Sequence, residues 1–243
     1  MLVKRAMSKN VVSVSVPGNR EKVLDLMRKE DKAVLPVVKG DTKQLVGLIT
    51  RSDLIVNPDE EQIAILMSTD LVTASPDDDV KDVAKKMIDN NVRRVPVVDD
   101  NGDLVGIITS FDLVSNALIK LESDDPVENF MITTVPTTWY KTPLNVAFET
   151  MKQFGLKSVL ALNDSAKLVG ILTETDFIEE SEIISERSEH SSTVGTEGDK
   201  WSWDSTSVLY IEKNCLKFTD KLVEDVGTHK VEVVNSKTKA SDC

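Results

Sequence analysis

The sequence predicts a mixed α/β (α+β) fold, made of tandem β-α-β-β-α repeats that pair through their sheets. Three observations predict it. The pattern Leu-Val-Gly-apolar-apolar-Thr-x-x-Asp occurs at residues 45–53, 104–112 and 168–176. Methionines recur at a similar interval, at positions 7, 67 and 131 and again at 27, 87 and 151. Prolines at positions 36 and 96 keep the same step. Self-similarity at a fixed period is typical of repeat proteins.

The second repeat indicates the order of the elements. A short strand at 71–74 precedes an acidic turn at 76–79, and carboxylates there favour the start of a helix. The helix that follows has apolar residues at helical spacing, namely Val80, Val83, Ala84, Met87 and Ile88. We then expect a buried strand at 94–98, a hairpin turn at 99–102, a strand at 104–109 and a helix at 111–118.

The first and third repeats follow the same plan. Asn19 is expected to cap the first-repeat helix, with Val23, Leu24 and Met27 facing the core. Thr142 is expected to cap the third-repeat helix, with proline at its first position and an apolar stripe formed by Leu144, Ala147, Phe148 and Met151. One such unit is too small to bury its own sheet face, so we expect the units to pair.

The repeats predict the domain organisation. We expect repeats at 3–57, 64–118 and 128–181, a linker at 182–222, and an incomplete fourth repeat at 223–243 that resembles residues 3–14. A trimmed chain and a naturally degenerate end both fit the last segment. Residues 179–207 are rich in Ser, Glu and Thr, which predicts a linker or mobile loop. Trp201 and Trp203 either anchor its end to the core or form a docking patch.

Composition excludes several classes of function. The 243 residues carry a net charge of −12, which argues against binding to nucleic acid or to an anionic membrane surface. No apolar run approaches the ~20 residues needed to span a bilayer, and the N-terminus lacks the core of a signal peptide, so a cytoplasmic protein is expected. Two cysteines and two histidines predict neither a disulfide framework nor a metal site. No catalytic motif occurs, so no enzyme activity is expected.

The repeated Thr-x-x-Asp has two interpretations. Threonine ends a strand and aspartate opens the next helix, so the pair can form an N-terminal capping box. The same arrangement places a hydroxyl, a carboxylate and free backbone amides together, where a phosphate or a ribose diol can bind. Both interpretations stay open from the sequence.

The three glycine-containing segments resemble cystathionine β-synthase (CBS) domains, together with the Arg94–Val98 strand and the Met-Ser/Thr opening of the first two repeats. The resemblance covers residues 3 to about 180 and the fragment after 223. The joint at 56–64 and the tryptophan-bearing linker are similar to those of archaeal four-CBS proteins. The resemblance implies paired repeats, called Bateman modules, with two clefts each.

The resemblance also implies a function. The chain is expected to be a regulatory sensor of an adenosyl ligand, which is AMP, ADP, ATP, S-adenosylmethionine or methylthioadenosine, with no resident cofactor. The implied nucleotide-binding residues are Thr50, Asp53, Thr109, Asp112, Thr173 and Asp176 for ribose and phosphate, Val12, Pro36, Val72 and Pro96 for adenine, and Arg93 and Arg94 for phosphate.

The departures from the family pattern rank the first two repeats as the better-formed pair. Lys32-Ala33-Val34 in the first repeat replaces the arginine pair of the second, and the third repeat has Pro136 in its first strand and Leu160 in place of proline. A homodimer and a regulated protein partner are expected, and pairing of two chains or of repeats within one chain both fit. The alternative function is a ligand-independent dimerisation or partner-docking module.

Overall fold

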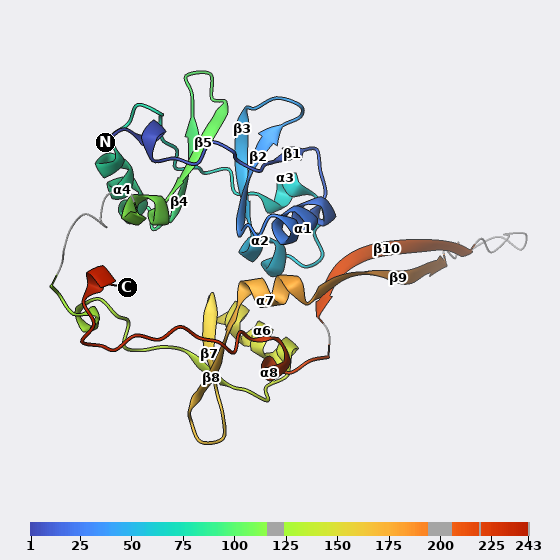
Figure 1. The fold of residues 1–243 in the computed structure, drawn as a ribbon. Coiled ribbons are helices and arrows are strands. Elements are labelled where there is room, and N and C mark those ends of the chain that lie inside the picture. The colour runs from blue at the N-terminus through green and yellow to red at the C-terminus, as the bar shows by residue number, and fades with distance from the viewer. Residues whose placement is uncertain (116–123, 194–205, 219, 243) are drawn as a thin grey trace, which may run out of the picture.

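The computed structural model describes residues 1–115, 124–193, 206–218 and 220–242. Figure 1 shows three repeats and a long β-hairpin. The first repeat begins with a short 3₁₀ helix η1 (Val3–Arg5), and its remaining elements are β1 (Val14–Val16), α1 (Arg20–Lys29), β2 (Val34–Lys39), β3 (Leu45–Thr50) and α2 (Arg51–Val56).

The other two repeats follow the same order of elements, except that the second lacks the first strand. The second repeat consists of α3 (Ile63–Leu66), α4 (Val80–Asp89), β4 (Arg94–Val98), β5 (Leu104–Thr109) and α5 (Ser110–Leu113). The third repeat consists of η3 (Val127–Asn129), β6 (Thr137–Trp139), α6 (Leu144–Gln153), β7 (Ser158–Leu162), β8 (Leu168–Thr173) and α7 (Glu174–Glu179). The predicted mixed α/β fold with tandem repeats is confirmed.

Each repeat is built on a small sheet. The first and third sheets have the orders β1-β2-β3 and β6-β7-β8, with a parallel and then an antiparallel pair. The second repeat has the antiparallel pair β4-β5 only. The strand expected at 71–74 is therefore wrong, because this segment makes a single bridge, from Ala74 to Val97.

The helix starts agree with the sequence except in the third repeat. The Asn19 side chain accepts a hydrogen bond from the amide of Lys22 and caps α1 as predicted. Thr142 does not cap α6, because the helix begins at Leu144 with Pro143 as its cap residue. The Leu144 amide instead donates to the carbonyl of Lys221 at 2.8 Å, so backbone from beyond the repeat satisfies this helix end.

The apolar stripes of the helices face the core with one exception. Ile88, expected on the buried face of α4, is 78% exposed, whereas Val80, Val83 and Met87 are buried. The helix presents a narrower apolar face than the pattern suggested. The helix expected at 111–118 begins at Ser110, and the residues after 115 lie outside the described part of the chain.

Repeats 1 and 2 pair by exchanging their opening segments. Ser8 of repeat 1 forms a bridge to Ile107 on β5, and Ser68 of repeat 2 forms the equivalent bridge to Leu48 on β3. The backbone approaches so closely that a Cβ at Gly106 would lie 2.5 Å from the sulfur of Met7. Glycine is therefore needed in the motif for the contact between repeats.

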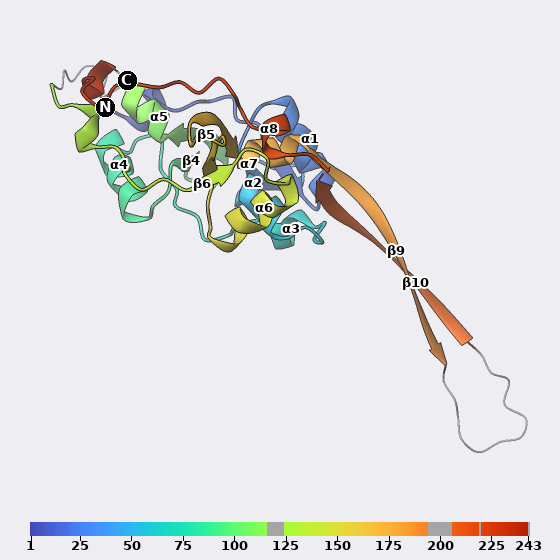
Figure 2. The same ribbon diagram turned by 90° about the horizontal axis from the view of Figure 1, so that it is seen from below.

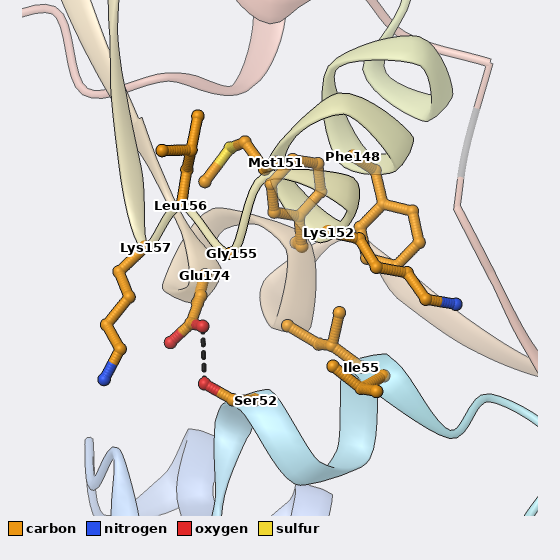
Figure 3. Close-up of a pocket in the computed structure, with 11 residues that line it drawn as sticks. Ser52, Ile55, Phe148, Met151, Lys152, Gly155, Leu156, Lys157 and Glu174 are labelled. Atoms are coloured by element: carbon orange, nitrogen blue, oxygen red, sulfur yellow. Dashed lines mark hydrogen bonds between the residues drawn. The ribbon is translucent and has the colours of Figure 1, made fainter. Parts of the chain in front are cut away.

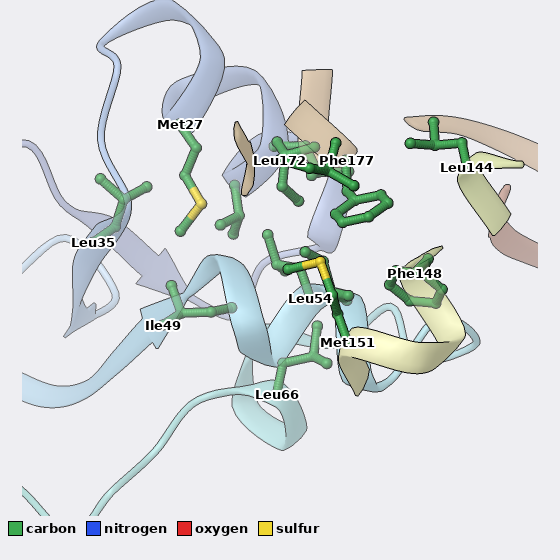
Figure 4. Packing of buried hydrophobic residues seen from close by; sticks show 14 of the residues in the cluster. Met27, Leu35, Ile49, Leu54, Leu66, Leu144, Phe148, Met151, Leu172 and Phe177 are labelled. Atoms are coloured by element: carbon green, nitrogen blue, oxygen red, sulfur yellow. The ribbon is translucent and has the colours of Figure 1, made fainter. Parts of the chain in front are cut away.

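Repeats 1 and 3 pack through their helices and share one hydrophobic core. Met27, Leu35 and Leu54 of repeat 1 belong to the same buried cluster as Phe148 and Phe177 of repeat 3, as Figure 4 shows. The guanidinium group of Arg28 on α1 donates to the carbonyl of Ile178 at 2.7 Å, which ties α1 to the end of α7. A second buried cluster lies within repeat 2 and the opening segment of repeat 1.

A β-hairpin lies where the linker was expected. Strands β9 (Ser181–Thr193) and β10 (Thr206–Phe218) pair in antiparallel register, with Ser181 opposite Phe218. Figure 2 shows the hairpin extending away from the repeats. The loop predicted over 179–207 is therefore wrong for Ser181–Thr193, because this polar segment pairs with the β-prone run around residues 208–211. Trp201 and Trp203 lie outside the described residues.

The segment after the hairpin packs against repeat 3. It contains α8 (Val223–Val226) and η4 (Ala240–Asp242). The bridge from Thr228 to Ile171 matches the bridge from Ser68 to Leu48, and Lys239 bridges Pro126. The segment after the hairpin therefore pairs with the sheet of repeat 3 in the same way as the opening segment of repeat 2 pairs with the sheet of repeat 1.

Candidate functional site

A cleft with a volume of about 330 Å³ lies between repeats 1 and 2. Its walls come from both repeats, because each opening segment crosses to the sheet of the other repeat. The lining residues are Ser8, Asn10, Val11, Val12, Asp31, Lys32, Ala33, Val34, Pro36, Arg94, Ile107 and Thr109. The structure thus brings together four of the predicted site residues, Val12, Pro36, Arg94 and Thr109.

Repeat 1 supplies the apolar side of the cleft. Val12 lies just before β1, and Pro36 lies in β2, which runs parallel to β1. Pro36 pairs with Leu48 of β3, so its position is fixed by both neighbouring strands. A flat apolar group can therefore contact a rigid wall on this side.

Repeat 2 supplies a guanidinium group and a hydroxyl group. Arg94 begins β4 and lies directly opposite Thr109, the last residue of β5. Ile107 is held in place by the bridge to Ser8, whose amide donates to the Ile107 carbonyl at 2.9 Å. The cationic end of the cleft is thus positioned by backbone pairing between the two repeats.

Positive charge converges at this end of the cleft. Burial lowers the pKa of Arg94, and the guanidinium groups of Arg51 and Arg93 lower it further by repulsion. Lys32 lines the same cleft, where Asp31 is the acidic lining residue. A bound anion would relieve this repulsion. The cleft is therefore cationic in a chain whose net charge is −12.

The aspartates of the repeated motif form capping boxes. In repeat 2, Asp112 Oδ2 accepts from the Thr109 amide at 2.8 Å and from Thr109 Oγ1 at 2.7 Å. Thr50 with Asp53 makes the same arrangement at the start of α2. The capping interpretation is confirmed, and these bonds fix the threonine that lines the cleft.

Eight of the predicted residues do not line this cleft, among them Asp112, whose capping bonds are described above. Thr50, Asp53, Val72 and Pro96 occupy the equivalent positions on the other side of the paired repeats, because the bridges at Ser8 and Ser68 match. Arg93 is exposed and does not line the cleft, although it directly precedes Arg94.

The third copy of the motif faces repeat 1. Thr173 and Asp176 form the capping box of α7, where Asp176 is buried. The two residues between them contact the first motif directly. Arg51 donates to Thr175, and Ser52 Oγ donates to Glu174 Oε1 at 2.5 Å. The first and third motifs are therefore joined through their variable positions.

Several cleft residues were missed, and one had a signal in the sequence. Asp31 has a φ of +45°, and Asn91 and Gly155 at the equivalent positions have φ values of +52° and +62°. This left-handed residue ends the first helix of each repeat and turns the chain toward the cleft. The recurrence of Asp, Asn or Gly at this position indicates the turn. Ser8, Asn10 and Ile107 carried no such signal.

The described parts of the chain lack two further features. No three His, Cys, Asp or Glu side chains gather there as a metal ion would require. No helix within those parts has the length and apolar character to cross a membrane.

Comparison with known proteins agrees with the repeat structure. The model of the CBS domain family matches residues 3–58, 61–118 and 127–182. Protein MJ1225 from Methanocaldococcus jannaschii is 23% identical over 197 residues, which are 73% of this chain and 70% of that protein. The crystal structure of MJ1225 superposes with a TM-score of 0.77 at 19% identity and covers 100% of this chain and 87% of that chain.

Other relatives match over a smaller part of their length. The inosine-5'-monophosphate dehydrogenase of Nitrosopumilus maritimus is 35% identical over 120 residues, which are 47% of this chain and 24% of that enzyme. The chain also spans 44% of MJ0188 from Methanocaldococcus jannaschii, at 30% identity. The likeness to the dehydrogenase thus concerns a minor part of that enzyme.

Proposed function

Because the chain belongs to the CBS domain family, we propose that it is a regulatory sensor that binds a phosphorylated adenosyl ligand between repeats 1 and 2. The ligand class is AMP, ADP or ATP. The observation that carries the proposal is the combination of an apolar wall, formed by Val12 and Pro36, with a cationic end that contains Arg94 and Lys32. Adenine fits the first feature and phosphate fits the second.

Charge distinguishes among the adenosyl ligands. Arg94 is exposed at the start of β4, and together with the nearby Arg51 and Arg93 it favours an anion. Hydrogen bonds to charged groups contribute up to about 1.5–3 kcal/mol each, and less where solvent screens them. S-adenosylmethionine carries a positive sulfonium group, and methylthioadenosine has no phosphate. We therefore expect both to bind more weakly than AMP in this cleft.

A ligand in the cleft would also act on repeat 3. Asp31 lines the cleft and forms an ion pair with Arg51 at 3.3 Å. Arg51 is itself buried and donates a hydrogen bond to Thr175. A phosphate beside Lys32 and Arg94 changes the field that Arg51 experiences. The ligand would thereby shift the equilibrium between two packing arrangements of repeat 3 on repeat 1. The size of the shift is set by the difference in the ligand's affinity for these two arrangements.

A second function is favoured by the helical face of repeat 2. Ile88 and Phe111 occupy the positions that Arg28 and Ser52 hold in repeat 1, where repeat 3 packs. Both are more than 75% exposed. This face fits the same face of a second copy of the chain, which would make the protein a dimerisation module. The two functions are compatible. In both, the protein would regulate a protein partner and would not itself catalyse a reaction.

A thermal-shift series tests the sensor function on protein shown to be free of nucleotide. A ligand that binds the native state alone adds about 2.7 kcal/mol at 100 times its Kd, so the melting temperature should rise with AMP, ADP or ATP. GTP should give no rise, and S-adenosylmethionine and methylthioadenosine a smaller one. The dimerisation module would be favoured instead by two results together. The melting temperature would not rise with any of these ligands, and the protein would sediment as a dimer that the substitution Phe111→Asp converts to a monomer.

A further inference from the structure

A second pocket lies between repeats 1 and 3, apart from the nucleotide cleft, and shares no lining residue with it. Figure 3 shows it between the helix α2 of repeat 1 and the helices α6 and α7 of repeat 3. Its volume is about 130 Å³, below the range of about 300–1,000 Å³ that is typical of drug-sized ligands, so it suits a smaller molecule. A molecule bound there would contact both repeats.

The floor of the pocket is apolar and rigid. It is formed by the buried side chains of Ile55, Phe148, Met151 and Phe177. Phe148 and Phe177 pack against each other with their ring centroids 5.3 Å apart. These residues belong to the core that joins the two repeats, so the floor is held in place whether or not the pocket is filled.

The rim carries two lysines. Lys152 and Lys157 are exposed and line the pocket, and Figure 3 shows Lys157 on the side of Glu174 and Lys152 on the other side. Among the residues that the structure describes, neither ammonium group lies within 4.0 Å of a carboxylate. Glu174 is the acidic lining residue, and its carboxylate already accepts from Ser52. The rim is therefore cationic overall.

We propose that this pocket binds a small amphipathic carboxylate, with its apolar body on the floor and its carboxylate at the rim, beside Lys152 or Lys157. Burial of the apolar body supplies most of the affinity, at about 0.8 kcal/mol for each buried CH₂ group. The lysines supply selection for the negative charge. The site is independent of the nucleotide cleft, and the bound acid would link α2 of repeat 1 to α6 of repeat 3.

The probe is octanoate, and the reporter is the methyl group of methionine in protein labelled with ¹³C at that methyl. Met151 lies on the pocket floor, and Met87 holds the same helical position in repeat 2. We expect octanoate to shift the Met151 signal until it saturates while the Met87 signal stays in place. No shift of Met151 up to the solubility limit, or equal shifts of both signals, would overturn the proposal.

The charge selection is tested with octan-1-ol and with lysine variants. Exposed ion pairs contribute modestly, so octanol should bind about 3- to 10-fold more weakly than octanoate. The double variant Lys152→Gln and Lys157→Gln should bind octanoate as weakly as octanol, while Lys85→Gln, on the exposed face of α4, should leave both affinities unchanged. Equal binding of the alcohol and the acid to the unmodified protein would overturn the assignment of the ligand class.

Discussion

Replacing Arg94 with glutamine is expected to weaken AMP binding by about 10- to 100-fold, because one or two charge-assisted hydrogen bonds to phosphate are lost. The substitution also removes one of the two cationic side chains that line the cleft, so that Lys32 alone remains. Adenosine, which lacks the phosphate, should bind the variant and the unmodified protein with the same affinity. Isothermal titration calorimetry with both ligands measures the difference.

The neighbouring arginine supplies a matched control. Arg93 and Arg94 are adjacent and both exposed, but only Arg94 lines the cleft. Arg93→Gln removes the same charge at nearly the same position, and screening limits its effect to about threefold or less. If Arg93→Gln weakened AMP binding as much as Arg94→Gln, the affinity would depend on net charge rather than on the cleft.

Phe177→Ala is expected to lower the free energy of unfolding by about 3–5 kcal/mol, which is typical of removing a buried aromatic ring. Phe177 is 1% exposed and packs against Phe148 and Phe218, with ring centroids 5.3 and 5.5 Å away. The cavity would open in the core that repeats 1 and 3 share (Figure 4). Urea denaturation followed by circular dichroism measures the loss.

An exposed phenylalanine of the same repeat is the control. Phe154 follows α6 and is 70% exposed, so Phe154→Ala should change the free energy of unfolding by about 0.5 kcal/mol or less. A loss under about 1 kcal/mol for Phe177→Ala would contradict the shared core, since cavity formation in a well-packed interior costs more than that.

Much of the fold could be predicted because the repeat period and the local patterns agree. Strands at 94–98 and 104–109 follow from apolar runs around the hairpin turn at Gly102, where φ is +80°. The cap at Asn19 and the buried positions Val23, Leu24 and Met27 follow from helical spacing. These features depend on contacts within one repeat, and sequence patterns report such contacts well.

The composition of the cleft could not be predicted because it depends on contacts between repeats. Arg94 belongs to repeat 2, yet it lines the same cleft as Val12 and Pro36 of repeat 1. The exchange of opening segments, seen in the bridge between Ser8 and Ile107, produces this combination. Nothing in one copy of the motif reports which neighbour completes its cleft.

The hairpin was missed for a different reason. The composition of residues 179–207 favours a loop, and β9 becomes a strand by pairing with β10 over thirteen residues on each side. Strand formation of this kind depends on a partner further along the chain more than on local propensity. Likewise, the exposed Ile88 fits the apolar pattern of α4 but lies on a face that no other described repeat covers.

The most direct test of the sensor function is a crystal structure of nucleotide-free protein soaked or co-crystallised with AMP. Our account predicts adenine between Val12 and Pro36 and the phosphate within about 3.2 Å of Arg94 and Lys32. AMP bound elsewhere, or an empty cleft at a concentration well above its Kd, would contradict the assignment of this cleft as the sensing site.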